Sequence, residues 1–226
     1  ATKTTRAKKG RKAAKKPVKK AKKSKPMIRR TPSNIGFSKN KFKDREPKST
    51  GPDSGITEIV FSFDCTGSMG QALAQAKTTI QETTKRLFQD VPDGRLRIGI
   101  VAHGDYCGRT EKQCMDSVDL TDNAKKISKF VKDSTGLPGG DSPECYELVL
   151  EQIQNFDWTE GSTRILVLIG DDQPHEKEAV KKQMTQFMNG KCFGKPREID
   201  WEEEADQLYE MGVKVYGVHA NNRAYA

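Results

Sequence analysis

The stretch ITEIVFSFDCTGSMGQALAQAK, residues 56–77, joins an apolar, β-branched run to an amphipathic one through a short polar turn. Residues 56–63 have the composition of a buried strand. Beyond the turn, apolar residues recur at Leu73, Ala76 and Ile80, which is the spacing of one helix face. A strand followed directly by a helix is the first unit of an α/β fold.

The same alternation continues along the chain. Further strands are predicted at 95–105, 115–121, 163–170 and 213–220, and further helices at 121–134, with Thr121 as the apparent N-cap, and at 145–156. This order predicts a three-layer α/β fold, in which a mostly parallel central sheet carries helices on both faces. Ligands of such sheets bind at the carboxyl ends of the strands, where Asp64, Asp105 and Asp171 are expected.

Charge divides the 226 residues into two parts. Residues 1–50 hold 20 Lys and Arg against two acids, whereas the remaining 176 residues hold 20 basic and 29 acidic side chains. The segment 1–54 is rich in Lys and Ala and poor in large apolar residues, so we expect it to be a disordered basic tail. Residues 55–222 are expected to form one folded domain.

The basic tail is a predicted ligand for nucleic acid or another polyanion, because phosphate neutralisation releases counterions. The residues that would carry this binding are Lys8, Lys9, Arg11, Lys12, Lys15, Lys16, Lys19, Lys20, Lys22 and Lys23. A solubilising or import tail without a stable partner is the alternative. No apolar stretch approaches the roughly 20 residues that span a bilayer, and the five cysteines lack paired CxxC spacing. We therefore expect an intracellular protein, nuclear or cytoplasmic, with a virion as a further setting.

The polar turn is a candidate metal site. Asp64, Thr66 and Ser68 stand on alternate residues, and Gly67 between them lets the backbone turn. Carboxylate and hydroxyl oxygens suit a hard cation such as Mg²⁺. Asp171, after the most apolar predicted strand, is placed to add a second carboxylate. The simpler interpretation is that Thr66 or Ser68 only caps the helix that follows.

Four stretches in order resemble the von Willebrand factor A domain. DCTGSM (residues 64–69) resembles the Asp-x-Ser-x-Ser motif of that family, and RIGIVAHGDY (97–106) its second strand. GGDSPE (139–144) resembles its middle metal loop, and LIGDDQPH (168–175) the segment with its last metal aspartate. The likeness covers residues 55–222 and is greatest to the A domains found beside atypical alpha-kinases.

The resemblance implies a metal site of the MIDAS type that holds Mg²⁺ or Mn²⁺. Thr66 and Ser68 would ligate the cation through their hydroxyls, and Asp64 and Asp171 largely through waters. Asp141 falls where the family commonly has a Thr. Asp172, next to Asp171, leaves open which of the two faces the metal. The family usually continues into a final helix, so the resemblance also implies a shortened domain.

By this resemblance the chain is a non-enzymatic adaptor or structural module, whose cation is completed by an exposed Asp or Glu of a protein partner. An enzyme is the first alternative, because DCTGS also resembles the Asp-x-Thr-Gly-Thr motif of haloacid dehalogenase-type phosphohydrolases. In that case Asp64 would be the nucleophile, and Asp171 and Asp172 would hold Mg²⁺. The second alternative is a nucleic-acid-binding protein in which the fold is only a scaffold.

Overall fold

The computed structural model describes residues 47–48, 51–92, 94–108, 110–140, 142–188 and 195–220. The predicted basic tail up to residue 46, with all of its polyanion-binding residues, lies outside these ranges. So does Asp141, the third carboxylate of the predicted metal site.

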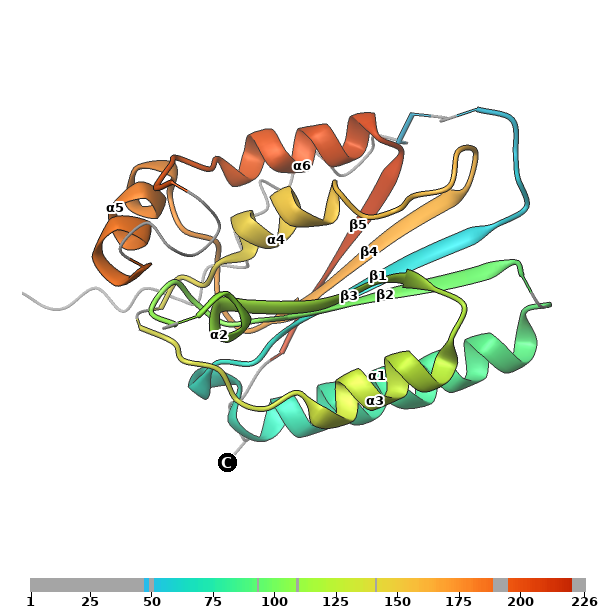
Figure 1. Ribbon diagram of the computed structural model, residues 1–226, viewed down its shortest axis with the longest axis horizontal. Coiled ribbons are helices and arrows are strands. Elements are labelled where there is room, and N and C mark those ends of the chain that lie inside the picture. Colours follow the sequence, from blue (N-terminus) through green and yellow to red (C-terminus); the bar gives the residue numbers. More distant parts are fainter. Residues whose placement is uncertain are drawn as a thin grey trace, which may run out of the picture. The chain divides into compact units, whose positions relative to one another are not determined.

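A five-stranded sheet forms the centre of the described domain (Figure 1). Its strands are β1 (Thr57–Asp64), β2 (Leu96–His103), β3 (Met115–Thr121), β4 (Thr163–Gly170) and β5 (Val213–His219). They are ordered β3-β2-β1-β4-β5, and all neighbouring pairs are parallel except β2 and β3. The predicted α/β class with a mostly parallel sheet is therefore confirmed.

Helices cover both faces of this sheet (Figure 1). One face packs against α1 (Gly70–Asp90) and α3 (Ala124–Asp133), and the other against α4 (Tyr146–Ile153) and α6 (Trp201–Glu210). Shorter or peripheral elements are η1 (Gly67–Met69), α2 (Glu111–Cys114) and α5 (Lys177–Met188). Each face has its own apolar cluster, so the sheet is buried from both sides at its centre.

The α1 and α3 layer follows the predicted apolar spacing. Ala76 and Ile80 of α1 are buried, as are Ile127 and Val131 of α3, at intervals of four residues that place each pair on one helix face. The predicted cap of α3 was wrong. Asn123, and not Thr121, accepts a hydrogen bond from the backbone N–H of Lys126 at 3.1 Å, because Thr121 still belongs to β3.

Three of the described helices, α2, α5 and α6, were not predicted from the sequence. Asp200 caps α6 by accepting a hydrogen bond from the backbone N–H of Glu202 at 3.0 Å. Only Ala205 and Leu208 of this ten-residue helix are buried. So few apolar positions give a weak periodic signal, and packing on the sheet stabilises the helix. Within the described ranges, every helix is too short or too polar to span a bilayer.

Candidate metal site

The turn after β1 brings three oxygen-bearing side chains together. The carboxylate Oδ1 of Asp64 accepts a hydrogen bond from the backbone N–H of Thr66 at 2.7 Å, which orders the turn. The hydroxyls of Thr66 and Ser68 lie 2.9 Å apart. Asp64 and Thr66 are buried, whereas Ser68 is exposed. The alternate spacing in the sequence thus becomes one continuous run of oxygens from the core to the surface.

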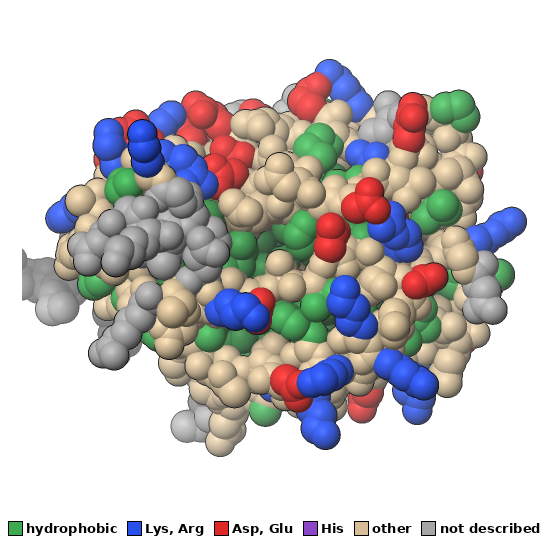
Figure 2. All heavy atoms as spheres, in the orientation of Figure 1, with side chains coloured by type: hydrophobic (Ala, Val, Ile, Leu, Met, Phe, Trp, Pro, Cys, Tyr) green, Lys and Arg blue, Asp and Glu red, His purple; other side chains and the backbone are tan. Residues whose placement is uncertain are grey.

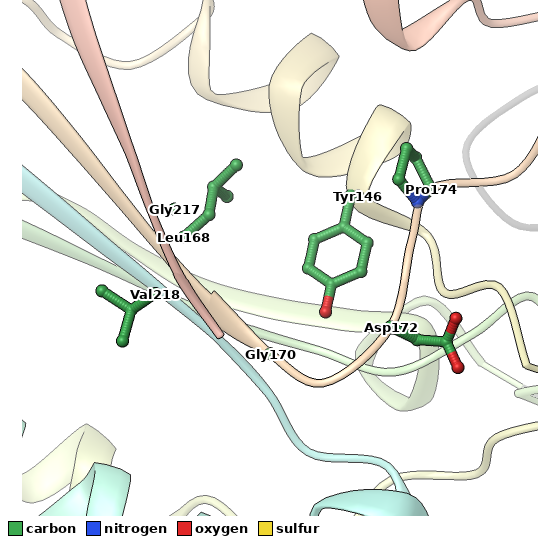
Figure 3. Close-up of a pocket in the computed structure, with 7 residues that line it drawn as sticks. All are labelled: Tyr146, Leu168, Gly170, Asp172, Pro174, Gly217 and Val218. Atoms are coloured by element: carbon green, nitrogen blue, oxygen red, sulfur yellow. The ribbon is translucent and has the colours of Figure 1, made fainter. Parts of the chain in front are cut away.

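The end of β4 adds a carboxylate to this run. Ser68 donates a hydrogen bond from Oγ to Asp171 Oδ1 at 3.1 Å, across 103 residues of sequence. Asp172 instead accepts a hydrogen bond from the backbone N–H of Gln173 at 2.9 Å. Asp172 and Tyr146 line the same small hollow, and Figure 3 shows the Asp172 carboxylate directed away from the Tyr146 ring. Of the two neighbouring aspartates, it is therefore Asp171 that contacts the DCTGS turn.

The loop before α4 packs onto the same turn. A Cβ on Gly139 would lie 3.0 Å from Cβ of Thr66, so the loop backbone approaches this side chain closely. The backbone N–H of Gly140 donates to Asp105 Oδ2 at 3.2 Å. Asp105, buried two residues after the end of β2, thereby supports the loop that leads to Asp141.

Glu144 is a further residue of this cluster, and it was not predicted as a site residue from the sequence. Its side chain is 2% exposed, and its Oε2 has no hydrogen-bond partner among the described residues. Burial, with the negative charges of Asp64 and Asp105, raises the pKa of Glu144 to about 9, although a hydrogen bond with Thr66 opposes the shift. A buried carboxyl group beside the Thr66 hydroxyl therefore belongs to the same cluster.

The carboxyl groups around the DCTGS turn have raised pKa values, as expected for buried acids whose negative charge is not compensated. Burial raises the pKa of Asp64 to about 7, helped by the negative charge of Asp171 and opposed by the hydrogen bonds of Thr66. Asp64 Oδ2 is buried without a hydrogen-bond partner within the described part of the chain. The pKa of Asp172 is also raised, mainly by burial. A bound cation would stabilise the ionised form of these carboxyl groups.

The spacing of the oxygens fits a hexacoordinate cation. Adjacent ligands at about 2.1 Å from an octahedral Mg²⁺ are about 3.0 Å apart. The Thr66–Ser68 and Ser68–Asp171 oxygen distances of 2.9 and 3.1 Å match two edges of such an octahedron. Across the described ranges, however, no three His, Cys, Asp or Glu side chains are grouped as metal ligands. A cation at this place would therefore depend on the two hydroxyls.

A second buried network holds the loop after β4 in place. His175 contacts Asp105 Oδ1 through Nε2 at 3.4 Å and Glu147 Oε1 through Nδ1 at 3.3 Å. Tyr106 donates to the same Glu147 oxygen at 2.7 Å, and the backbone N–H of His175 donates to Glu147 Oε2 at 3.1 Å. The loop that carries Asp171 is thus held against the segment that follows β2 and against α4.

Gly170 allows β4 to end close to α4. A Cβ at this position would lie 1.7 Å from the hydroxyl oxygen of Tyr146 and 3.2 Å from Cβ of Asp64. Any larger residue would push Tyr146 away from the strand end. The glycine before the two aspartates is therefore explained by packing beside the candidate site.

Comparisons with known proteins agree with this fold. No family model matches the chain. The alpha-protein kinase vwkA of Dictyostelium discoideum is 23% identical over 168 residues, which are 74% of this chain and 26% of the kinase. A crystal structure of the pilus adhesin SpaC from Lactobacillus rhamnosus GG has a TM-score of 0.52 and 16% identity, covering 77% of this chain and 25% of the adhesin. Its open conformation has the same TM-score at 15% identity, covering 80% and 26%. The chain thus spans about a quarter of the length of these relatives, and the adhesin likeness shows the fold alone.

Proposed function

We propose that residues 55–222 form a von Willebrand factor A-type module that binds a protein partner through a divalent cation of the MIDAS type. One observation carries the proposal. Neighbouring oxygens of Thr66, Ser68 and Asp171 lie at the distance expected between adjacent octahedral ligands. Beside them, the buried Oδ2 of Asp64 has no hydrogen-bond partner among the described residues.

Each residue has a separate role in this proposal. Thr66 and Ser68 hold Mg²⁺ or Mn²⁺ through neutral oxygens, so the cation keeps most of its charge. Asp171 orients the hydroxyl of Ser68, Asp64 orders the turn through the backbone N–H of Thr66, and both carboxylates neutralise part of the charge from one side. The cation, when bound, supplies a coordination position for an exposed Asp or Glu of the partner. A third carboxylate, from Asp141, would tighten metal binding and weaken the attraction for an acidic partner.

The burial of Asp64 favours binding over catalysis. The adhesin shares the fold of this chain and carries no further argument. The similar kinase is matched over only 26% of its length, so its activity is not transferred. Asp64 is completely buried, whereas the nucleophile of a phosphohydrolase must reach the phosphorus atom. We therefore favour the non-enzymatic module over the phosphohydrolase alternative.

Thr66→Ala is expected to weaken Mn²⁺ binding at least tenfold, because it removes a ligand oxygen and leaves the fold in place. Thr78→Ala is the matched control. Thr78 lies on the exposed face of α1, away from the site, and its hydroxyl donates a hydrogen bond to the backbone O of Ala74. Calorimetric titration of Mn²⁺ into the full chain and both variants measures the effect. Equal affinities in all three proteins would refute the metal site and leave the fold as a scaffold beside a basic tail.

We also propose that residues 1–50 attach this module to nucleic acid or another polyanion in the nucleus, the cytoplasm or a virion. Their 20 basic residues carry the proposal, since the remainder of the chain has an acidic excess. On the face shown in Figure 2, Lys and Arg side chains are interspersed with Asp and Glu, and no large area has one charge. The folded part therefore offers little to a polyanion there.

Removal of residues 1–50 is expected to abolish retardation of duplex DNA in an electrophoretic shift assay. Binding of the full chain should fall by orders of magnitude between about 50 and 200 mM salt, because several phosphates are neutralised at once. If the shortened and full chains bind DNA equally well, the tail is not the polyanion ligand.

A further inference from the structure

Four buried polar atoms beside the DCTGS turn lack a hydrogen-bond partner among the described residues. They are Oδ2 of Asp64, Nε2 of His103, Oε2 of Glu144 and the hydroxyl oxygen of Tyr146. The four residues are at most 6% exposed, so bulk water does not reach these atoms. Because a buried polar group without a partner is costly, such groups in native proteins bind one another or an enclosed molecule.

Three of these side chains share the α4 and α6 face of the sheet. Asp64 and His103 are paired residues at the ends of β1 and β2. Val60 and Val101, which have the same orientation as these two on their strands, belong to the apolar cluster of that face. The ring of His103 lies edge-on against that of Tyr146, with centroids 4.8 Å apart. The acid, the imidazole and the phenol therefore meet at one place.

The hydroxyl of Tyr146 reaches the strand ends. Figure 3 shows its ring extending from α4 towards the loop that follows Gly170. A Cβ on Gly170 would lie 1.7 Å from this hydroxyl and 3.2 Å from Cβ of Asp64, so the two side chains are close together. Burial raises the pKa of Tyr146, with help from the negative charges of Asp64 and Glu144. The backbone N–H of Asp172 approaches the phenol oxygen and opposes the shift, but the O–H proton still needs an acceptor.

The four atoms combine donors with acceptors. Burial lowers the pKa of His103 to about 3, so its ring is neutral and carries one proton. Nδ1 of this ring lies 3.0 Å from Oγ of Ser62. When Ser62 donates to Nδ1, the proton stands on Nε2, which then donates as the Tyr146 hydroxyl does. The ionised carboxyl groups of Asp64 and Glu144 supply the acceptors.

A water molecule is the complement of this set, because it both accepts and donates hydrogen bonds. Buried waters usually make about three hydrogen bonds to groups that otherwise lack a partner. A second cation fits less well, since the donor hydrogens would point at it. The described residues also contain no group of three His, Cys, Asp or Glu side chains that could hold a metal ion. We propose that this place binds at least one ordered water molecule, which links Tyr146 and His103 to Oδ2 of Asp64.

The bound water makes Tyr146 and His103 positioning residues for Asp64. A carboxylate oxygen has two lone pairs, so Oδ2 accepts from the water and keeps a lone pair for the DCTGS turn. The hydrogen bond of Oδ1 with the backbone N–H of Thr66 fixes the other side of the carboxylate. Asp64 is then held from both sides without a cation, and the inference does not depend on the proposed function.

Oxygen-17 relaxation dispersion of water counts long-lived buried waters, and it tests the site on the full chain in EDTA. We expect Tyr146→Phe to hold about one such water fewer than the wild type, because it removes the hydroxyl and keeps the ring. Tyr216→Phe is the matched control, because this tyrosine is 52% exposed on β5. It should hold as many buried waters as the wild type.

A high-resolution crystal structure of the wild type without metal tests the place directly, whether or not the variant folds. We expect a water oxygen at about 2.8 Å from both the Tyr146 hydroxyl and Oδ2 of Asp64. A direct hydrogen bond between these two groups would overturn the inference, as would equal water counts in the wild type and in a folded Tyr146→Phe variant. A metal that remains bound at this place in EDTA would assign it to a cation instead. Since neither experiment adds metal, failure to bind Mn²⁺ would count against the proposed function alone.

Discussion

In the metal-free protein at pH 8, Asp64→Asn is expected to raise the free energy of unfolding and, in the same protein, to abolish divalent-cation binding. Folding raises the pKa of Asp64 from an ordinary 3.8 to about 7, chiefly because the carboxyl group is buried. The contribution of Asp64 to the free energy of unfolding is therefore greatest below pH 3.8, and it is lost as the pH rises through about 7. The difference corresponds to roughly 4 kcal/mol as an upper limit.

Asn carries no charge at any pH, so the variant avoids this loss. We expect a gain of about 1–2 kcal/mol at pH 8, since the buried Asn amide needs hydrogen-bond partners of its own. The gain should shrink towards pH 5. Saturating Mn²⁺ should make the wild type more stable than the variant. A free Mn²⁺ concentration of about 100 times the Kd stabilises the wild type by roughly 2.7 kcal/mol and leaves the variant, which does not bind it, unchanged. Urea unfolding at both pH values, with EDTA or with Mn²⁺, measures each effect.

Asp172→Asn is the matched control for this experiment. Asp172 follows Asp171 and its pKa is also raised by burial, but its carboxylate accepts a hydrogen bond from the backbone N–H of Gln173, whereas Asp171 accepts the one from Ser68. It should retain Mn²⁺ binding. If the Asp64→Asn variant binds Mn²⁺ like the wild type, the metal site is contradicted. If it is less stable than the wild type at pH 8 without metal, the destabilising charge of the buried Asp64 is contradicted.

The second large effect is expected at the other end of the sheet, where Glu58→Ala should destabilise the domain by about 3 kcal/mol. Glu58 is completely buried in β1. Its Oε1 accepts from Arg97 Nη1 and Thr159 Oγ1, both at 2.8 Å, and its Oε2 from the backbone N–H of Thr159 at 2.9 Å and Ser162 Oγ at 2.6 Å. Alanine would leave these donors, including a partly buried guanidinium group, without their acceptor.

Asp157→Asn is the control for charge at Arg97. Asp157 also pairs with this guanidinium, at 2.9 Å, but its side chain is 83% exposed. Screening by water limits such a pair to less than about 1 kcal/mol. Urea unfolding of the two variants should separate these values. Equal losses would mean that the buried position of Glu58 contributes nothing beyond a surface ion pair.

Much of the fold was predictable because its signals are local. Residues 56–77 contain a strand, a turn and the start of a helix, and each is recognisable from composition and periodicity without knowledge of the rest. The strands at 163–170 and 213–220 were found in the same way, within one residue of their observed ends. Helix α6 was not found, because a helix with two buried residues is specified mainly by the sheet against which it packs.

The candidate site also has a part that the local sequence predicts and a part that depends on the tertiary structure. Asp64, Thr66 and Ser68 are neighbours in sequence, so their convergence follows from one turn. That Asp171 rather than Asp172 meets Ser68 depends on how β4 lies against β1, with Ile169 opposite Phe63. A shift of one residue in this register would reverse the faces of the two aspartates.

The sequence by itself therefore determined the α/β class and the motif of alternating oxygens, because both follow from interactions between residues close along the chain. Only the tertiary structure placed Glu144 beside Thr66, surrounded Glu58 with donors, and left Tyr216 and Val218 exposed on an edge strand. Those features depend on strand order, register and helix packing between distant segments. No local pattern encodes them, since burial and hydrogen-bond partners are assigned only when the layers come together.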